Sequence, residues 1–116
     1  SPVNELRFLE HLYLDTNKFE TLPSGVYKLD FLRELHADEN QLSSIEVFDS
    51  KVLEVLSLGH NDLIQFPDLR NQTSLVELNL EHNMITTVPD RIPETLEHLN
   101  LQSKHHIQQR DIRRIP

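Results

Sequence analysis

The most constraining feature of this sequence is an internal repeat of 21 to 23 residues. The repeats begin at Leu9, Leu32, Leu53, Leu75 and Leu96, so successive starts are 23, 21, 22 and 21 residues apart. Each repeat opens with three core positions in the spacing Leu-x-x-Leu-x-Leu, in which one position is alanine and the others are leucine. Self-similarity at such a period indicates a solenoid, in which each unit packs on its neighbours.

Each Leu-x-Leu pair predicts a short β-strand whose apolar side chains point to one face. A single strand of this kind cannot bury its leucines, but the strand of the next repeat can lie beside it at about 4.8 Å. Successive strands then run in the same direction, so the chain must return behind the sheet after every repeat. The predicted fold is an α/β repeat solenoid, curved and right-handed, with a parallel concave sheet of about five short strands.

An asparagine stands three residues after the third core position in four repeats, at Asn17, Asn40, Asn61 and Asn83. Its amide carries donors and an acceptor, so it can satisfy backbone groups where the strand turns away. We predict that these four residues are buried and form a ladder that joins each turn to the turn of the next repeat. In the fifth repeat Lys104 stands at this position and the pattern ends.

Prolines follow the last apolar position of three repeats, at Pro23, Pro67 and Pro89. Proline lacks the backbone N–H group and disfavours a continuous helix. We therefore expect irregular or 3-10 segments on the convex side, with short helical turns at Val26–Leu29 and Val47–Lys51.

The spacing LxxLxLxxNxL resembles that of the leucine-rich repeat family, and the resemblance covers roughly residues 6–101. The stretch LPSGVYKLDFLREL, residues 22–35, is similar to the typical extracellular class. The stretch VPDRIPETLEHLNL, residues 88–101, is similar to the shorter repeats of matrix proteoglycans and some bacterial effectors. The resemblance implies a curved solenoid that recognises proteins, and it does not imply an enzyme.

The array is predicted to occupy residues 1–102, with a partial repeat at 1–8 and the five repeats starting near 9, 32, 53, 75 and 96. Residues 103–116, with a net charge of +3, are predicted to form a basic tail or a divergent terminal segment. Because solenoids need polar end repeats, we interpret the chain as an internal piece of a longer array. Flanking repeats, or a second copy in a homodimer, would then cover its ends. A small complete domain is the alternative.

The composition excludes several classes of function. The 116 residues include no cysteine, which excludes disulfides, cysteine zinc sites and cysteine nucleophiles. No apolar run approaches the length of about 18 residues that indicates a membrane span. The formal net charge of −8 argues against nucleic acid as a partner and favours a basic protein surface. No phosphate loop or nucleophile elbow is present, so we predict neither catalysis nor a cofactor.

The third, fifth and seventh positions of each repeat are predicted to point out of the sheet and form its concave face. None of these fifteen residues is Lys or Arg, and five are Asp or Glu. A solvated surface normally mixes both signs, so the bias indicates a basic or donor-rich ligand; a merely soluble acidic face is the alternative. The candidate ligand-binding residues are Tyr13, Asp15, Glu34, His36, Asp38, Val55, Ser57, Gly59, Glu77, Asn79, Glu81 and Asn100.

The middle repeat presents three small residues on this face, Val55, Ser57 and Gly59. We predict that they form a shallow notch between acidic walls, and that the notch accepts an anchor residue of the partner. Asp15 and Asp38 occupy the same position in neighbouring repeats, about 5 Å apart. Such a like-charge pair is destabilising unless something neutralises it, so it also indicates a basic ligand.

Two histidines and one sequon lie outside this face. His60 and His82 share the eighth position of adjacent repeats next to Glu39, but no fourth ligand accompanies them. We therefore predict no metal site. Asn71 opens the triplet NQT, which fits a glycosylation sequon. It lies on the return side, where a glycan would leave the concave face open.

The sequence thus predicts a binding module of a receptor ectodomain or a secreted recognition protein of the innate-immune type. A structural or dimerisation segment is a second hypothesis. An intracellular scaffold, located in the cytoplasm, is a third.

Overall fold

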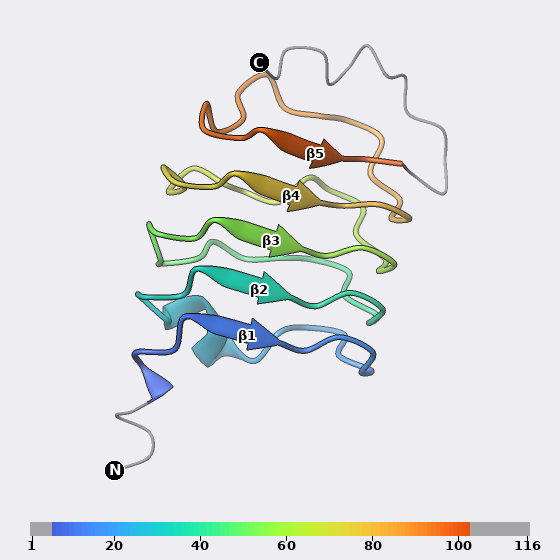
Figure 1. Ribbon diagram of the computed structural model, residues 1–116. Coiled ribbons are helices and arrows are strands. Elements are labelled where there is room, and N and C mark those ends of the chain that lie inside the picture. Colours follow the sequence, from blue (N-terminus) through green and yellow to red (C-terminus); the bar gives the residue numbers. More distant parts are fainter. Residues whose placement is uncertain (1–5, 103–116) are drawn as a thin grey trace.

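The computed structural model describes residues 6–102 as a solenoid, coloured from blue to red in Figure 1. The predicted tail at 103–116 and residues 1–5 of the partial repeat lie outside the described residues. Each repeat supplies one strand of three residues, and the strands are β1 (His11–Tyr13), β2 (Glu34–His36), β3 (Val55–Ser57), β4 (Glu77–Asn79) and β5 (His98–Asn100).

The strands form one parallel sheet in the order of the sequence, β1-β2-β3-β4-β5. The pairing joins equivalent positions of successive repeats, so that one row contains Leu12, Leu35, Leu56, Leu78 and Leu99. After each of the strands β1 to β4 the chain turns away and returns behind the sheet (Figure 1). The predicted fold, a parallel solenoid with about five short strands, is confirmed.

The leucines of the repeat fill a core between the sheet and the return segments. Leu35 and Leu56 are fully buried, and Leu42, from the segment after the asparagine, joins them. Burial of one such side chain contributes roughly 1.5–3 kcal/mol. Burial is weaker in the first and last described strands, where Leu12 and Leu99 are partly exposed. The central repeats therefore contribute most to the stability of the sheet.

The asparagine ladder closes each turn on the preceding repeat. His60 has a positive φ of 55°, and the chain reverses there, so that the next residue, Asn61, is only 1% exposed. Among its partners are the backbone oxygens of Ala37, Leu58 and Gly59, to which its Nδ2 donates, and the N–H of Leu42, which donates to its Oδ1. Two of these partners belong to the preceding repeat. The asparagine of the later repeat therefore makes the link, rather than that of the earlier repeat.

Not every ladder residue is buried as predicted. Asn40 and Asn83 are buried and repeat the bonds of Asn61. Asn17 is exposed, and its amide donates to the oxygens of Leu14 and Asp15 in its own turn. The described residues contain no earlier turn that would offer the two cross-repeat partners.

The return segments are mostly irregular, as predicted. The first contains a 3-10 helix, η1 (Ser24–Lys28), which begins two residues before the turn predicted at Val26–Leu29. The helical turn predicted at Val47–Lys51 does not form. There the N–H of Asp49 donates to the oxygen of Tyr27 over 2.8 Å, so a bond to the preceding repeat replaces the helical one. Among residues 6–102, no helix has the length and apolar character needed to cross a membrane.

Candidate functional site

The structure places the predicted ligand-binding residues on one face of the sheet. In every strand the central leucine turns toward the core, and its two neighbours alternate to the other side. The parallel register then aligns these neighbours in rows across the sheet. The concave face is thus one continuous surface, but the solvent exposure of its side chains differs from repeat to repeat.

The most accessible aromatic group of this face is Tyr13 at the end of β1. Its side chain is 63% exposed. Its ring stacks on the imidazole of His36 in β2, with ring centroids 4.7 Å apart and planes inclined by 11°. Offset stacking of this kind contributes about 0.5–1.5 kcal/mol and fixes the orientation of both rings.

A carboxylate lies beside this ring stack. Oε1 of Glu34 is 3.2 Å from Nε2 of His36, and its Oε2 is 3.6 Å from Nε2 of His11. The Glu34 side chain remains 32% exposed. Two imidazoles therefore hold the Glu34 carboxylate in place while solvent still reaches it.

The like-charge pair of Asp15 and Asp38 does not depend on a ligand for neutralisation. Oδ1 of Asp15 accepts the backbone N–H of Asp38 over 2.7 Å. Oδ1 of Asp38 accepts the N–H of Gly59 over 2.7 Å and the hydroxyl of Ser57 over 2.8 Å. Backbone N–H groups stabilise a carboxylate, so these two residues join neighbouring repeats. Their pairing is a structural feature and gives no separate indication of a basic ligand.

The notch predicted at the middle repeat is filled. Ser57 is 7% exposed because its hydroxyl donates to Asp38 and accepts from Nδ2 of Asn79. Gly59 is also buried. A Cβ atom at Gly59 would lie 3.0 Å from Cγ of Glu81 and 3.2 Å from Nδ2 of Asn79. Longer side chains of the next repeat cover Ser57 and Gly59, while Val55 is half-buried, so no open notch forms at the two small residues.

A shallow depression instead opens between β4 and β5, with a volume of about 530 Å³. Glu77 lies in it, and its carboxylate makes no hydrogen bond or ion pair within residues 6–102. Sequence reasoning did not single out Glu97, which lies at the second position of its repeat. The lining residues are Ser57, Glu77, Leu78, Asn79, Glu97, His98, Leu99 and Asn100.

The two histidines at the eighth position form a stacked pair. The rings of His60 and His82 lie 4.4 Å apart at 21°, and Nε2 of His60 is 3.8 Å from Oε1 of Glu81. In the described residues, however, no three His, Cys, Asp or Glu side chains gather closely enough to hold a metal ion. The stacked rings bring the turns of two adjacent repeats into contact.

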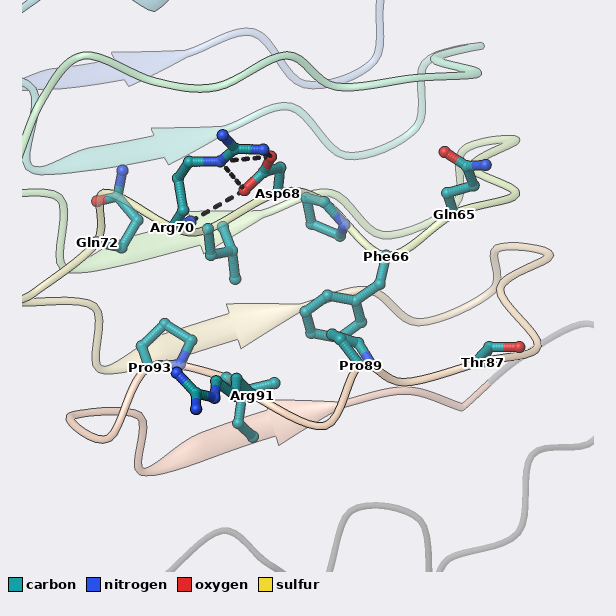
Figure 2. Close-up of a pocket in the computed structure, with 12 residues that line it drawn as sticks. Gln65, Phe66, Asp68, Arg70, Gln72, Thr87, Pro89, Arg91 and Pro93 are labelled. Atoms are coloured by element: carbon teal, nitrogen blue, oxygen red, sulfur yellow. Dashed lines mark hydrogen bonds and ion pairs between the residues drawn. The ribbon is translucent and has the colours of Figure 1, made fainter.

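Figure 2 shows a pocket of about 680 Å³ on the return side, which the sequence reasoning missed. Its walls include Phe66, Pro89 and Pro93. Hydrogen bonds from Arg70 hold the pKa of Asp68 below its usual range. In the sequence, the prolines indicated only an interrupted helix. However, Pro67 and Pro89 stand at matching positions of adjacent repeats, and both line this pocket.

One polar group of this pocket is not satisfied by its surroundings. Gln72 is 5% exposed, and its side-chain oxygen has no hydrogen-bond partner among residues 6–102. The neighbouring Asn71, the predicted glycosylation site, is half-buried. The return side therefore contains a mixed apolar and polar pocket beside the sequon.

Comparison with known proteins finds relatives that are leucine-rich repeat proteins. A family model described as Leucine Rich Repeat matches residues 74–99. Fibromodulin of Oryctolagus cuniculus is 36% identical over 93 residues, which are 77% of this chain and 62% of fibromodulin. Lumican of Gallus gallus is 39% identical over 103 residues, which are 84% of this chain and 29% of lumican.

A relative of a different kind is the probable inactive serine/threonine-protein kinase roco10 of Dictyostelium discoideum. It is 33% identical over 94 residues, which are 75% of this chain and 4% of the kinase. The chain thus spans less than two thirds of each of these relatives. No solved structure matches the chain significantly. The repeats, the fold and these relatives together show that the chain belongs to the leucine-rich repeat family.

Proposed function

We propose that the chain is a protein-recognition module whose concave face binds a partner with a basic surface. The observation that carries this proposal is the charge of the face, where five of fifteen residues are acidic and none is Lys or Arg. A surface of one sign attracts a partner of the opposite sign and raises the rate of encounter. The exposed Tyr13 and the carboxylate of Glu77, which has no partner within residues 6–102, offer groups that are free to contact it.

The proposal extends to an extracellular location, in a secreted recognition protein or a receptor ectodomain of the innate-immune type. Fibromodulin and lumican are extracellular matrix proteins. Their matches cover 77% and 84% of the chain. These likenesses, together with the sequon at Asn71, support secretion and a binding role rather than catalysis.

The match to the roco10 kinase favours a second candidate function, a scaffold or dimerisation segment of an intracellular protein. That match is confined to the repeat region of the kinase. Deglycosylation of the native protein separates the two candidates. A loss of mass on treatment, abolished by Asn71→Gln, supports the extracellular module, whereas an unchanged mass together with recovery from the cytosol supports the intracellular one.

Site-specific photo-cross-linking tests the face itself. A photoreactive phenylalanine analogue replaces Glu77 on the concave face or, as the matched control, the exposed Thr87 on the return side. Each protein is exposed to an extract of its source tissue. We expect a cross-linked partner protein from position 77 and none from position 87. Cross-links from position 87 alone would move recognition to the return side and refute the proposal.

Charge variants test the same face with the captured partner. Gly59→Arg should weaken binding because it displaces Glu81 and adds a positive charge. Glu77→Gln should slow association and weaken its salt dependence, because it removes a free charge. Arg70→Glu, on the return side, should leave the kinetics unchanged. Binding kinetics at two salt concentrations measure all three effects.

A further inference from the structure

The return-side pocket lies between two neighbouring return segments. All of its lining residues belong to the segments that follow β3 and β4 (Figure 2). Its volume of about 680 Å³ falls within the range of about 300–1,000 Å³ that is usual for small-molecule sites. Because the pocket opens between two described segments, repeats added at either end of the array would not fill it.

Apolar side chains form a large part of the pocket wall. Phe66 and Ile92 line it, are partly buried and pack against the hydrophobic core. Pro89 and Pro93 continue the wall along the segment after β4. The ring of proline fixes its own backbone torsion, so this part of the wall is rigid. The wall therefore offers a preformed apolar surface, which favours a ligand with an apolar body.

The pocket also gathers the basic side chains of this half of the molecule. Residues 53–102 contain eight Asp or Glu residues but only two Lys or Arg residues, which are Arg70 and Arg91. Both line the pocket, Arg70 from the segment after β3 and Arg91 from the segment after β4 (Figure 2). Asp68 is the only acidic residue of the described lining, so the lining has a net charge of +1. A positive pocket on an acidic molecule favours an anionic ligand.

The polar groups of the lining differ in how far the protein itself satisfies them. Nε of Arg70 donates to Oδ1 and Oδ2 of Asp68 over 3.0 and 2.9 Å, so its charge is largely balanced. The side chain of Arg91 makes no hydrogen bond or ion pair within residues 6–102. Gln72 is 5% exposed, and its side-chain amide makes no hydrogen bond within the same residues. The pocket therefore contains an unengaged guanidinium and a buried amide whose hydrogen bonds the protein does not supply.

We propose that the return-side pocket binds a small monocarboxylate with an apolar body, at a site separate from the concave face. A guanidinium group matches a carboxylate with two parallel hydrogen bonds. Arg91 would hold the anionic end in this way while the apolar body packs on Phe66 and Ile92. The terminal torsion of Gln72 is soft, so its amide can turn a donor toward the carboxylate. A lining charge of +1 balances one carboxylate, whereas a doubly charged phosphate monoester would keep an uncompensated charge.

Titration with small probes tests the class of ligand. The probes are phenylacetate, its uncharged isostere phenylacetamide, and acetate, which has the charge but no ring. The readouts are the NMR signals of the Ile92 methyl groups and the Gln72 amide in the 116-residue chain. We expect phenylacetate to shift both and to bind about 2–5-fold tighter than phenylacetamide, as a partly exposed ion pair would give. Acetate should bind at least about 10-fold more weakly than phenylacetate, because it buries no ring.

Variants locate the two halves of the site. Arg91→Gln should lower the affinity for phenylacetate about 2–5-fold and leave that for phenylacetamide unchanged. Arg33→Gln is the matched control, because it removes the same charge from an exposed arginine outside the pocket. It should change neither affinity. Ile92→Ala should weaken both probes alike, because it removes part of the apolar wall and leaves the charges in place.

Three results would overturn the assignment. Phenylacetate could leave the Ile92 signals unshifted, it could bind no better than phenylacetamide, or Arg33→Gln could reduce its affinity as much as Arg91→Gln does. The last result would mean that the whole molecule attracts the anion without a site at Arg91. None of these results touches the proposed function, because cross-linking from position 77 tests the concave face with a protein partner.

Discussion

Two parts of the concave face are built from equivalent positions of the repeat but differ strongly in solvent exposure. In the first repeat Tyr13 is 63% exposed, whereas the equivalent Ser57 of the third repeat is 7% exposed. Tyr13 makes a ring contact and keeps its hydroxyl free within the described residues. The hydroxyl of Ser57 is bonded on both sides, to Asp38 and to Asn79.

This difference teaches that the size of a residue does not decide whether its position is open. Ser57 and Gly59 are small, so the longer side chains of the next repeat reach over them and bond there. Tyr13 is large, and its ring rises above the sheet beside a neighbour of similar size, His36. Accessibility on this face therefore depends on the neighbour, and the largest side chain provides the most accessible surface.

The same contrast between the first repeat and the centre appears beneath the sheet. Asn17 is exposed and bonded within its own turn, while Asn61 is buried and bonded across two repeats. Likewise Leu12 is partly exposed and Leu56 is fully buried. The stability of the solenoid is thus concentrated in the centre, and the first repeat is freer to accept substitutions.

The largest expected effect comes from the core row of the sheet. Leu56→Ala should lower the free energy of unfolding by about 2–5 kcal/mol, because it leaves a cavity among fully buried neighbours. Leu12→Ala should cost clearly less, since Leu12 already contacts solvent. Urea denaturation of both variants measures the difference. Equal losses would show that the first repeat is as tightly packed as the centre.

The ladder gives the next largest effect. Asn61→Ala removes the partners of several buried backbone groups, and each stranded group costs about 1–3 kcal/mol. Asn17→Ala should change the stability by no more than about 0.5 kcal/mol, as is usual for exposed positions. Thermal unfolding followed by circular dichroism compares the two. A midpoint that Asn61→Ala leaves unchanged would contradict the ladder bonds.

A smaller difference in stability is expected between substitutions at Ser57 and at Tyr13 on the concave face. Ser57→Ala removes one donor and one acceptor from the bonded centre and should cost about 0.5–1.5 kcal/mol. Tyr13→Ala should cost less than this, since it loses one ring contact of an exposed side chain. If Tyr13→Ala proved the more destabilising change, the ring would have a structural role, and its availability for binding would be in doubt.

Much of the fold was predictable because it follows from local periodicity. The alternation of Leu-x-Leu fixes which side chains enter the core, and the repeat length fixes the register of the sheet. The turn expected at Val47–Lys51 was wrong because a hydrogen bond from Asp49 to Tyr27, in another repeat, competes with helix formation. Such a bond between distant residues leaves no local pattern.

The candidate site was predictable only as a face. Strand alternation identified its residues, including Tyr13 and Glu34, but it gave no side-chain conformations. Whether the middle repeat is open depends on where Asn79 and Glu81 place their polar ends, and these choices follow from bonds to other repeats. The return-side pocket was missed for a related reason, since two irregular segments form it and neither has a recognisable period.

The smallest effect compares the two glycines and tests how tightly the centre is filled. Neither glycine has a positive φ, so alanine fits the backbone at both positions. At Gly25 no atom lies within 4 Å of an added Cβ, and Gly25→Ala should stabilise by about 0.4–1 kcal/mol, because it restricts the unfolded chain.

At Gly59 the added Cβ would lie 3.0 Å from Cγ of Glu81, so Glu81 must move. Glu81 also accepts a hydrogen bond from Nδ2 of Asn100 over 3.1 Å, and the movement should weaken that bond. Alanine stabilises by lowering the conformational entropy of the unfolded chain, and the loss at Glu81 should cancel this gain. The stability of Gly59→Ala should therefore stay within about 0.5 kcal/mol of the original value. Unfolding free energies and the NMR signals of the Asn100 side-chain amide measure both consequences. Equal gains for the two variants, with the Asn100 signals unchanged, would mean that the middle of the concave face is open after all.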